Sequence, residues 1–264
     1  MITVTRENNI ALMSRYPDNY FELAIVDPPY GILNKTKRGG DHKFNMAEYT
    51  EWDVKPDDEY FKELFRVSKN QIIWGGNYFN QIWLRSEYNK GFIIWDKNQP
   101  ESLNNFSMAE MAWSSLDKPS KIFRYSVRKN RNKIHPTQKP IELYEWLLKM
   151  YAKQGDKILD THLGSGTIAV ACYNAGISLT ACEISETYFL KSLEKISELI
   201  PKTSIQKNSD DVYTIVFPNQ LNPDNEKHNE YIEQIQQLKL FNESKPKYTS
   251  TKKEKVQLVT AVLR

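Results

Sequence analysis

Short apolar runs alternate with amphipathic segments along most of the chain. Brief runs rich in Ile, Val and Trp are typical of buried strands, whereas apolar positions spaced three and four apart predict helices. The predicted strands cover residues 2–4, 23–26, 71–74, 92–95, 108–113, 157–159 and 179–182. The predicted helices cover residues 10–16, 57–67, 78–84, 141–151, 167–174 and 187–199. This alternation predicts an α/β fold with a mainly parallel sheet that helices cover on both faces.

Three regions interrupt the pattern. Residues 31–55 are rich in glycine and charge, which predicts a long, mobile loop. Residues 117–134 are basic and irregular, and we expect no regular element there. Residues 218–264 are rich in Asn, Gln, Glu and Lys, and predict one amphipathic helix followed by a flexible tail. We therefore expect one main domain over residues 1–217 and a C-terminal extension over 218–264.

The composition is typical of a soluble globular protein, with 40% hydrophobic and 26% charged residues among 264. We find neither an apolar run long enough to span a bilayer nor a signal-peptide pattern, so we expect a cytoplasmic location. Cys172 and Cys182 are the only cysteines, and both follow apolar residues. They predict two buried free thiols rather than a disulfide framework or a cysteine zinc site.

The net charge of +3 is too small to indicate a partner, but the charge is unevenly distributed. One cluster of basic residues, interleaved with Phe123 and Tyr125, contains no acid: Lys118, Lys121, Arg124, Arg128, Lys129, Arg131 and Lys133. A second cluster consists of Lys35, Lys37 and Arg38. A run of charge is usually a solvated face. If both clusters line one cleft, they favour a polyanionic partner.

The tetrapeptide Asp27-Pro28-Pro29-Tyr30 directly follows the apolar run at 23–26. The carboxylate of Asp27 can accept a hydrogen bond, and a residue before proline is held in an extended conformation. Tyr30 offers a ring face on which a flat molecule can stack. These groups can hold a planar molecule with an exocyclic amine. The four residues alone fit a strand followed by a proline-rich turn equally well.

A second candidate site follows the predicted strand at 157–159. The segment Asp160-Thr161-His162-Leu163-Gly164-Ser165-Gly166-Thr167 is a glycine turn before a helix, which lets backbone approach a ligand closely. Glu183 ends the next predicted strand, where an acid suits a ribose diol. The turn lacks the full dinucleotide spacing and the lysine of a phosphate loop. A nucleoside-type ligand is therefore favoured over a dinucleotide or a triphosphate.

The hexapeptide His135-Pro136-Thr137-Gln138-Lys139-Pro140 directly precedes the predicted helix at 141–151. Its side chains offer donors close to a helix N-terminus, where carboxylates are stabilised. By itself the segment favours a capped helix that begins with proline.

Taken together, these three segments resemble the amino-methyltransferases of DNA, which methylate adenine N6 or cytosine N4. Asp27-Pro28-Pro29-Tyr30 is similar to the catalytic motif of that family, and the other two segments are similar to its cofactor motifs. The catalytic motif precedes the cofactor motifs, which resembles the circularly permuted beta group with target recognition in the middle. The resemblance extends over about residues 2–200. It implies a Rossmann-like fold with a mainly parallel seven-stranded sheet, a catalytic domain over 1–217 and target recognition within 97–134.

The resemblance also implies the roles of individual residues. Asp27 and the Pro28 carbonyl would accept hydrogen bonds from the target amine, while Pro29 and Tyr30 complete the catalytic motif and Tyr30 stacks on the flipped base. S-adenosyl-L-methionine would be bound by Asn8, Asp27, His135, Thr137, Gln138, Lys139, Asp160, Thr161, His162, Gly164, Ser165, Gly166, Thr167, Glu183 and Ile184. Within this set, Glu183 would bind the ribose hydroxyls, and Thr137 and Lys139 the carboxylate end. Asn8 and His162 depart from the family pattern, which has an acid and a phenylalanine at these positions. No metal site is expected.

The expected function is site-specific methylation of adenine N6 in double-stranded DNA, with the adenine flipped out of the duplex. Lys35, Lys37, Arg38, Lys121, Arg124, Arg128, Lys129, Arg131 and Lys133 would contact the DNA. Cytosine-N4 methylation is an alternative, although that branch tends to carry serine at the position of Asp27. RNA adenine methylation is another, although those relatives tend to carry tryptophan at the position of Tyr30. A non-catalytic nucleic-acid-binding subunit, a homodimer and a cognate restriction endonuclease as partner stay open, and the recognised DNA sequence is not encoded in any pattern that we can read.

Overall fold

The computed structural model describes residues 1–32, 53–83, 91–99, 107–129, 133–201, 204–209 and 211–217. The chain divides into two compact units, Met1–Phe217 and Pro218–Arg264. All described residues belong to the first unit. The predictions for residues 218–264 and for most of the loop at 31–55 therefore lie outside the described residues.

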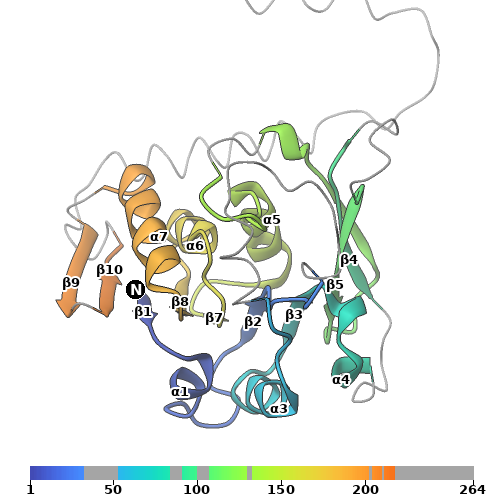
Figure 1. Ribbon diagram of the computed structural model, residues 1–264, viewed down its shortest axis with the longest axis horizontal. Helices are drawn as coiled ribbons and strands as arrows, with labels where there is room; N and C mark the ends of the chain where they lie inside the picture. The colour runs from blue at the N-terminus through green and yellow to red at the C-terminus, as the bar shows by residue number, and fades with distance from the viewer. Residues whose placement is uncertain are drawn as a thin grey trace, which may run out of the picture. The chain divides into compact units, whose positions relative to one another are not determined.

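One mixed sheet forms the centre of the first unit (Figure 1). Its strands are β1 (Ile2–Arg6), β2 (Leu23–Val26), β3 (Gln71–Trp74), β4 (Phe92–Asp96), β5 (Ala109–Ser114), β6 (Lys121–Arg124), β7 (Lys157–Asp160), β8 (Ser178–Glu183), β9 (Ile205–Ser209) and β10 (Val212–Ile215). Their order is β6-β4-β5-β3-β2-β7-β8-β1-β10-β9. The five strands β3-β2-β7-β8-β1 are parallel to their neighbours in this series, and β5 is antiparallel to both β3 and β4.

The mainly parallel core agrees with the prediction, but the sheet is wider than predicted. Seven strands were expected, and the structure has ten in the described residues. The additional strands lie at the two edges: β6 next to β4, and the antiparallel pair β10 and β9 next to β1. The edge strands β6 and β9 pair on one side only and are largely exposed, so they carry no long apolar run. The strand β10 lies between β1 and β9, and its sequence Val-Tyr-Thr-Ile was not predicted as a strand. The predicted absence of a regular element at 117–134 is wrong for β6, because its sequence Lys-Ile-Phe-Arg contains only a weak signal.

Helices cover both faces of the sheet, as predicted (Figure 1). One face carries α5 (Ile141–Tyr151), α6 (Thr167–Ala175) and α7 (Glu186–Leu199), and the other carries α1 (Asn9–Met13), α3 (Asp58–Val67) and α4 (Asn80–Trp83). Side chains alternate along β2, with Leu23 and Ile25 in the core beneath α5, α6 and α7. Ala24 and Val26 belong to the second core, which includes α3. This alternation follows from the two-residue period of a strand.

The helix α3 shows how local sequence positions a side chain for the site. Asp57 precedes the helix and accepts a hydrogen bond from the Tyr60 backbone N–H at 3.0 Å, which satisfies one free donor of the first turn. Tyr60, Phe61 and Leu64 are buried at helical spacing. Burial of each such side chain stabilises the fold by roughly 1.5–3 kcal/mol. The same burial turns the Tyr60 hydroxyl toward Thr161, which follows β7.

The two cysteines and the lengths of the helices can also be compared with the sequence. Cys172 and Cys182 are buried free thiols, as predicted. None of the helices in the described residues has the length and apolar character needed to cross a membrane.

Candidate active site

A pocket of about 840 Å³ lies at the carboxyl ends of the parallel strands. Its wall includes Asn8 after β1, Asp27 after β2, Gly75 after β3, Thr161 after β7 and Glu183 at the end of β8. Open α/β sheets bind ligands at this edge because loops from several parallel strands converge there. The volume is in the range of sites for a small molecule or cofactor.

The structure brings the three sequence motifs together around this pocket. The predicted residues that line it are Asn8, Asp27, Pro28, Pro29, Tyr30, His135, Thr137, Gln138, Lys139, Thr161, His162, Gly164, Ser165, Thr167, Glu183 and Ile184. Asp160 and Gly166 were predicted in the same site but do not line the pocket. Asp160 accepts a hydrogen bond from the backbone of the turn, and Gly166 is the residue of the turn that precedes α6.

Asp27 lies between two hydrogen-bond donors. The Tyr30 hydroxyl donates to Oδ1 of Asp27 at 2.5 Å. The Lys139 ammonium pairs with Oδ2 of the same carboxylate. Burial raises the pKa of Asp27, and the Lys139 charge opposes this rise. The carboxylate therefore faces the pocket with one donor on each oxygen and with lone pairs to spare.

Lys139 is positioned differently from the sequence prediction. Its side chain is almost completely buried, and its ammonium lies between Asp27 and Glu110, 3.2 Å from Oε2 of Glu110. It was expected to bind a ligand carboxylate, but both neighbouring carboxylates belong to the protein. The role of Lys139 toward the cofactor stays a prediction, because a lysine near a helix N-terminus indicates only that a charge is there, and here the ammonium pairs with the protein's own carboxylates.

Glu110 and Lys97 line the pocket and were not found from the sequence. Oε1 of Glu110 accepts from the Lys97 ammonium at 2.7 Å. The two lysines lower the pKa of Glu110 to about 2, against the effect of its burial. One signal was available, since Glu110 is the only charged residue in the apolar run at 108–113.

The glycine turn after β7 is held by the carboxylate that ends β8. Gly164 and Gly166 have left-handed backbone, with φ of 55° and 74°. The Gly164 N–H donates to Oε2 of Glu183 at 3.0 Å, and the Ser185 N–H donates to Oε1 at 2.9 Å. Burial raises the pKa of Glu183. The Ile184 backbone also hydrogen-bonds this carboxylate. A carboxylate can accept about four hydrogen bonds, so acceptor capacity is left for a ligand hydroxyl.

A second hydrogen-bonded group lies behind the turn. Asp160 accepts from the His162 N–H at 3.0 Å, and burial raises its pKa to about 8. Nδ1 of His162 lies 2.9 Å from the Thr161 hydroxyl, which in turn lies 2.7 Å from the Tyr60 hydroxyl. Nε2 of His162 lies 3.3 Å from the Asn9 amide nitrogen. Burial lowers the pKa of His162 to about 3, so its ring is neutral.

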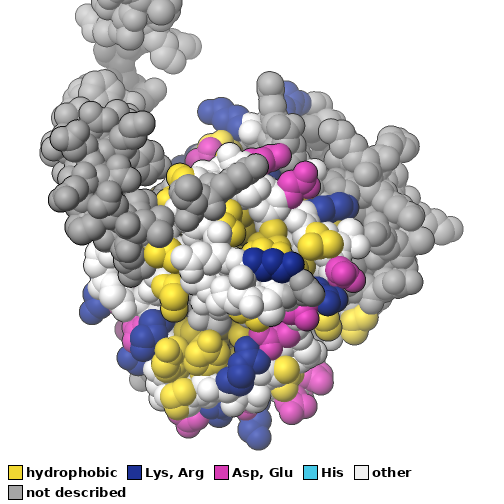
Figure 2. All heavy atoms as spheres, turned by 90° about the vertical axis from the view of Figure 1, so that its left-hand side faces the viewer, with side chains coloured by type: hydrophobic (Ala, Val, Ile, Leu, Met, Phe, Trp, Pro, Cys, Tyr) yellow, Lys and Arg dark blue, Asp and Glu magenta, His cyan; other side chains and the backbone are white. Residues whose placement is uncertain are grey.

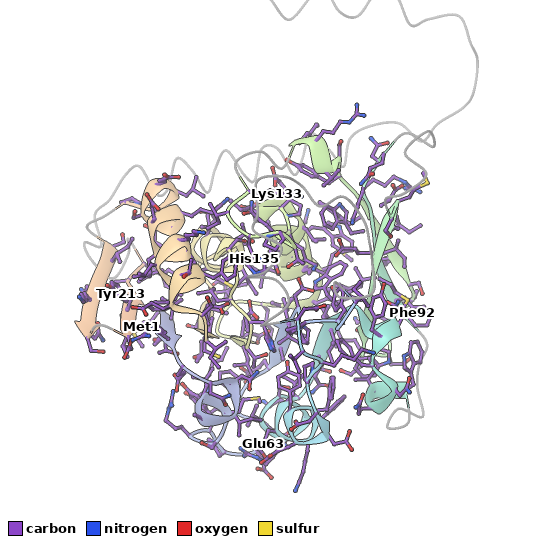
Figure 3. The ribbon with its side chains drawn as sticks, viewed as in Figure 1. Met1, Glu63, Phe92, Lys133, His135 and Tyr213 are labelled. Atoms are coloured by element: carbon purple, nitrogen blue, oxygen red, sulfur yellow. The ribbon has the colours of Figure 1, made fainter. Side chains whose placement is uncertain are left out.

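The segment before α5 contributes a second neutral histidine. His135, labelled in Figure 3, packs edge-on against Tyr188 of α7 with 4.4 Å between ring centroids. Its Nδ1 lies 3.1 Å from the Thr137 hydroxyl. Burial lowers the pKa of His135 to about 3. The ring thus braces this segment against α7 without adding charge to the pocket.

Asn8 has a structural role at the pocket. Its side-chain oxygen accepts from the backbone N–H groups of Ile10, at 2.8 Å, and Ala11, at 3.3 Å. It is therefore the N-cap of α1. A side chain that was expected to bind the cofactor therefore also fixes the start of a helix.

The aromatic wall of the pocket contains one ring that the motif predicted and one that it did not. The rings of Tyr30 and Tyr78 stack, with centroids 5.0 Å apart and an angle of 17° between their planes. Both residues line the pocket. The pair gives a flat apolar surface next to Asp27.

The predicted basic residues lie away from the pocket. Lys121, Arg124, Arg128, Lys129 and Lys133 are described and none lines it. Lys121 and Arg124 belong to β6, at the sheet edge opposite to β9. On the face that carries β9 and β10, the described Lys and Arg side chains alternate with acidic and hydrophobic ones, without a continuous basic area (Figure 2). Lys35, Lys37, Arg38 and Arg131 lie outside the described residues.

The sequence of this chain is similar to those of known proteins. A family model described as DNA methylase, N6_N4_Mtase, matches residues 58–194, more than half of the chain. The type II methyltransferase M.HpaI of Haemophilus parainfluenzae is 27% identical over 233 residues, covering 72% of this chain and 72% of the relative.

Two solved structures share the fold. The M1.HpyAVI–SAM complex has a TM-score of 0.52 at 19% identity, covering 74% of this chain and 99% of that one. The cytosine-N4-specific PvuII DNA methyltransferase has a TM-score of 0.51 at 13% identity, covering 75% of this chain and 90% of that one. The predicted Rossmann-like methyltransferase fold is confirmed.

Proposed function

We propose that this chain, which belongs to the DNA methylase family, is a site-specific enzyme that methylates the N6 amine of a flipped adenine in double-stranded DNA. DNA methyltransferase activity at an exocyclic amine follows from the family. Adenine as the target and the roles of the residues below are our proposal. The observation that carries it is the Asp27 carboxylate at a pocket shared with the glycine turn.

S-adenosyl-L-methionine is the cofactor, and the glycine side of the pocket fits it. The carboxylate of Glu183 keeps lone pairs for the two ribose hydroxyls, and the backbone at Gly164 allows close approach. His135 and His162 are neutral, so they add no charge that would repel a cationic ligand. When bound, the cofactor supplies an electrophilic methyl group on a sulfonium. We reassign Lys139 from the cofactor carboxylate to Asp27.

Asp27 and the Pro28 carbonyl hold the target amine. The amine of adenine is a poor nucleophile because its lone pair is conjugated with the ring. Hydrogen bonds from its two N–H groups to these oxygens favour a pyramidal nitrogen, which directs the lone pair toward the cofactor side of the pocket. Asp27 then acts by position and charge, in a site where preorganised groups are most effective. The branch that methylates cytosine tends to carry serine in this position, which favours adenine for this chain.

The aromatic wall supports a base outside the duplex. Flipping costs a few kcal/mol because stacking and pairing are lost. Stacking on Tyr30 offsets about 1–3 kcal/mol of this cost. Basic residues of the β6 edge, including Lys121 and Arg124, would contact phosphates and contribute a salt-dependent part of the affinity.

Methyl transfer from labelled S-adenosyl-L-methionine tests the proposal. Purified protein is incubated with duplex DNA of mixed sequence, the DNA is digested to nucleosides, and the labelled nucleoside is identified. We expect label on N6-methyladenine at one recurring sequence. Label on N4-methylcytosine would replace adenine with cytosine, and tight DNA binding without transfer would indicate a non-catalytic subunit.

A further inference from the structure

Four charges of alternating sign form a row that starts at the proposed methylation site. Asp27 pairs with Lys139, Lys139 with Glu110, and Glu110 with Lys97. The row joins the end of β2, the segment before α5, the strand β5 and the segment after β4. It is largely shielded from water, since the side chains of Lys139 and Lys97 are only 1% and 14% exposed.

The buried Lys139 ammonium has two carboxylate partners, although one would neutralise its charge. Asp27 alone would balance the Lys139 charge, yet a second carboxylate lies 3.2 Å from the same ammonium. The Trp74 ring also lies near this ammonium, with its centroid 5.0 Å away, but an aromatic ring is no substitute for an anion. A buried ammonium that loses its carboxylate is strongly destabilised. Glu110 therefore gives Lys139 a second place to pair without leaving the interior.

The proposed chemistry makes this second place useful. As the structure stands, the Tyr30 hydroxyl and the Lys139 ammonium each take one oxygen of Asp27. Each oxygen keeps a lone pair, but an amine that approaches Oδ2 shares that oxygen with the charged Lys139 donor. If Lys139 moves toward Glu110, the ammonium keeps a carboxylate partner while Asp27 accepts a hydrogen bond from the amine.

We propose that Glu110 is a positioning residue for methyl transfer: it draws the Lys139 ammonium away from Asp27 as the target amine engages that carboxylate. This inference rests on the proposed function, since the amine is the substrate of that reaction.

The same shift serves the end of the reaction. When the amine nitrogen bonds to the methyl carbon, the carbon–sulfur bond breaks and its electron pair goes to sulfur. The nitrogen is then left with a positive charge and one proton too many. Asp27, released from Lys139, accepts that proton and later passes it to water. The neutral methylated amine can then leave.

The titration of Asp27 reports on this coupling. Groups that act on Asp27 come from every element around it: Tyr30, Tyr60 of α3, Glu110 of β5, Lys139, Tyr144 of α5 and Asp160 of β7. The Glu110 charge raises the pKa of Asp27, and the Lys139 charge lowers it. Removing the Glu110 charge should lower this pKa, whereas removing Lys97 should raise it, because Glu110 then pairs more closely with Lys139.

The first measurement uses the full-length protein without cofactor. Aspartate is labelled with ¹³C at the side-chain carboxyl, and the Asp27 signal is assigned by its loss in Asp27→Asn. We expect the midpoint of Asp27 to fall by about one pH unit in Glu110→Gln and to rise in Lys97→Met. Glu194→Gln, an exposed change of the same kind on α7, should leave it unchanged.

The second measurement follows methyl transfer. Glu110→Gln should lower kcat at least about tenfold with little change in KM for S-adenosyl-L-methionine, and Glu110→Asp should recover part of the loss. A loss of kcat at nearly constant KM, recovered in part by Glu110→Asp, is not expected from a merely structural role. The spectrum of each variant shows whether it is folded, and Lys97→Met tests the same row if Glu110→Gln is not.

Equal midpoints in wild type and both variants, or shifts in the same direction, would overturn the inference. So would a wild-type kcat in folded Glu110→Gln. A wild-type protein that methylates no DNA would instead overturn the proposed function, and with it the role of Glu110 in transfer.

Discussion

The ring of Tyr30 lies against Gly75, the residue that directly follows β3. A β-carbon on residue 75 would lie 2.1 Å from Cε1 of the Tyr30 ring. Gly75 also has a φ of 67°, in the left-handed region that favours glycine. The position of Tyr30, the aromatic residue of the catalytic motif, therefore requires a glycine directly after the neighbouring strand β3.

Gly75→Ala should displace the Tyr30 ring and reduce methyl transfer at least about tenfold, because a base-stacking surface would move. Left-handed backbone alone costs an alanine about 1–2 kcal/mol of stability. Gly155→Ala is the matched control, since Gly155 has a φ of 91° and nothing within 4 Å of an added β-carbon. A transfer assay and urea unfolding measure activity and stability separately. Equal transfer rates in Gly75→Ala and Gly155→Ala would contradict this prediction.

Asp27→Ala should reduce methyl transfer by about 10²–10³-fold, because the oxygen that holds the target amine is lost. Binding of S-adenosyl-L-methionine should be nearly unchanged, since Glu183 and the glycine turn lie at other strand ends. Calorimetry of cofactor binding and a transfer assay measure the two effects separately. Loss of cofactor binding in a folded Asp27→Ala protein would contradict the roles assigned to the two sides of the pocket.

Glu183→Gln should do the reverse and weaken cofactor binding. A hydrogen bond to a charged group contributes about 1.5–3 kcal/mol, so Kd should rise roughly 10–100-fold. The amide would also place an NH₂ group against a backbone N–H, of Gly164 or of Ser185. Glu194→Gln serves as the exposed control. An unchanged Kd, measured by calorimetry, would remove Glu183 from the cofactor site.

Asp160 should make stability depend on pH. Its pKa is raised from 3.8 to about 8 by burial, so between these values the folded state holds a proton that the unfolded state has released. Stability should therefore fall as pH rises through this window, by at most about 1.4 kcal/mol per pH unit. Asp160→Asn removes this loss, and should gain stability relative to wild type between pH 5 and pH 8.

The two buried histidines act in the opposite direction. The pKa values of His135 and His162 are lowered from 6.5 to about 3, so their contribution to stability is lost as pH falls below 6.5. They are present in wild type and in Asp160→Asn, and their effect cancels in the difference. Urea unfolding at several pH values measures that difference, and a constant value would show that Asp160 is ionised in the folded protein.

Basic residues at the β6 edge should set the salt dependence of DNA binding. If Lys121 and Arg124 each contact a phosphate, replacing both with Gln should reduce the slope of log K against log salt by about two. Lys207→Gln, on β9 at the opposite edge, is the control. Binding titrations at several salt concentrations measure the slope. An equal slope in wild type and the double variant would place the DNA elsewhere.

The local pattern identified the elements of the sheet core and the helices on them. Ile72 lies in a short, wholly buried run and Leu147 on the buried face of an amphipathic helix, and both patterns can be read along a single segment. The edge strands β6 and β9 were missed for the same reason, because they are only partly buried. Their strand conformation comes from pairing with a neighbour that is remote in sequence.

For the site, the sequence determined which groups are present, and the tertiary structure decided what they face. Asp27, the glycine turn and Glu183 were identified because motif chemistry is local. Lys97, Tyr78 and the direction of Lys139 could not be identified, and Glu110 stood out only as a charge in an apolar run. The ends of β3, β4 and β5 and the segment before α5 meet only when the sheet forms. Parallel strands bring their carboxyl ends to one edge, and side-chain direction there depends on burial and on the nearest opposite charge.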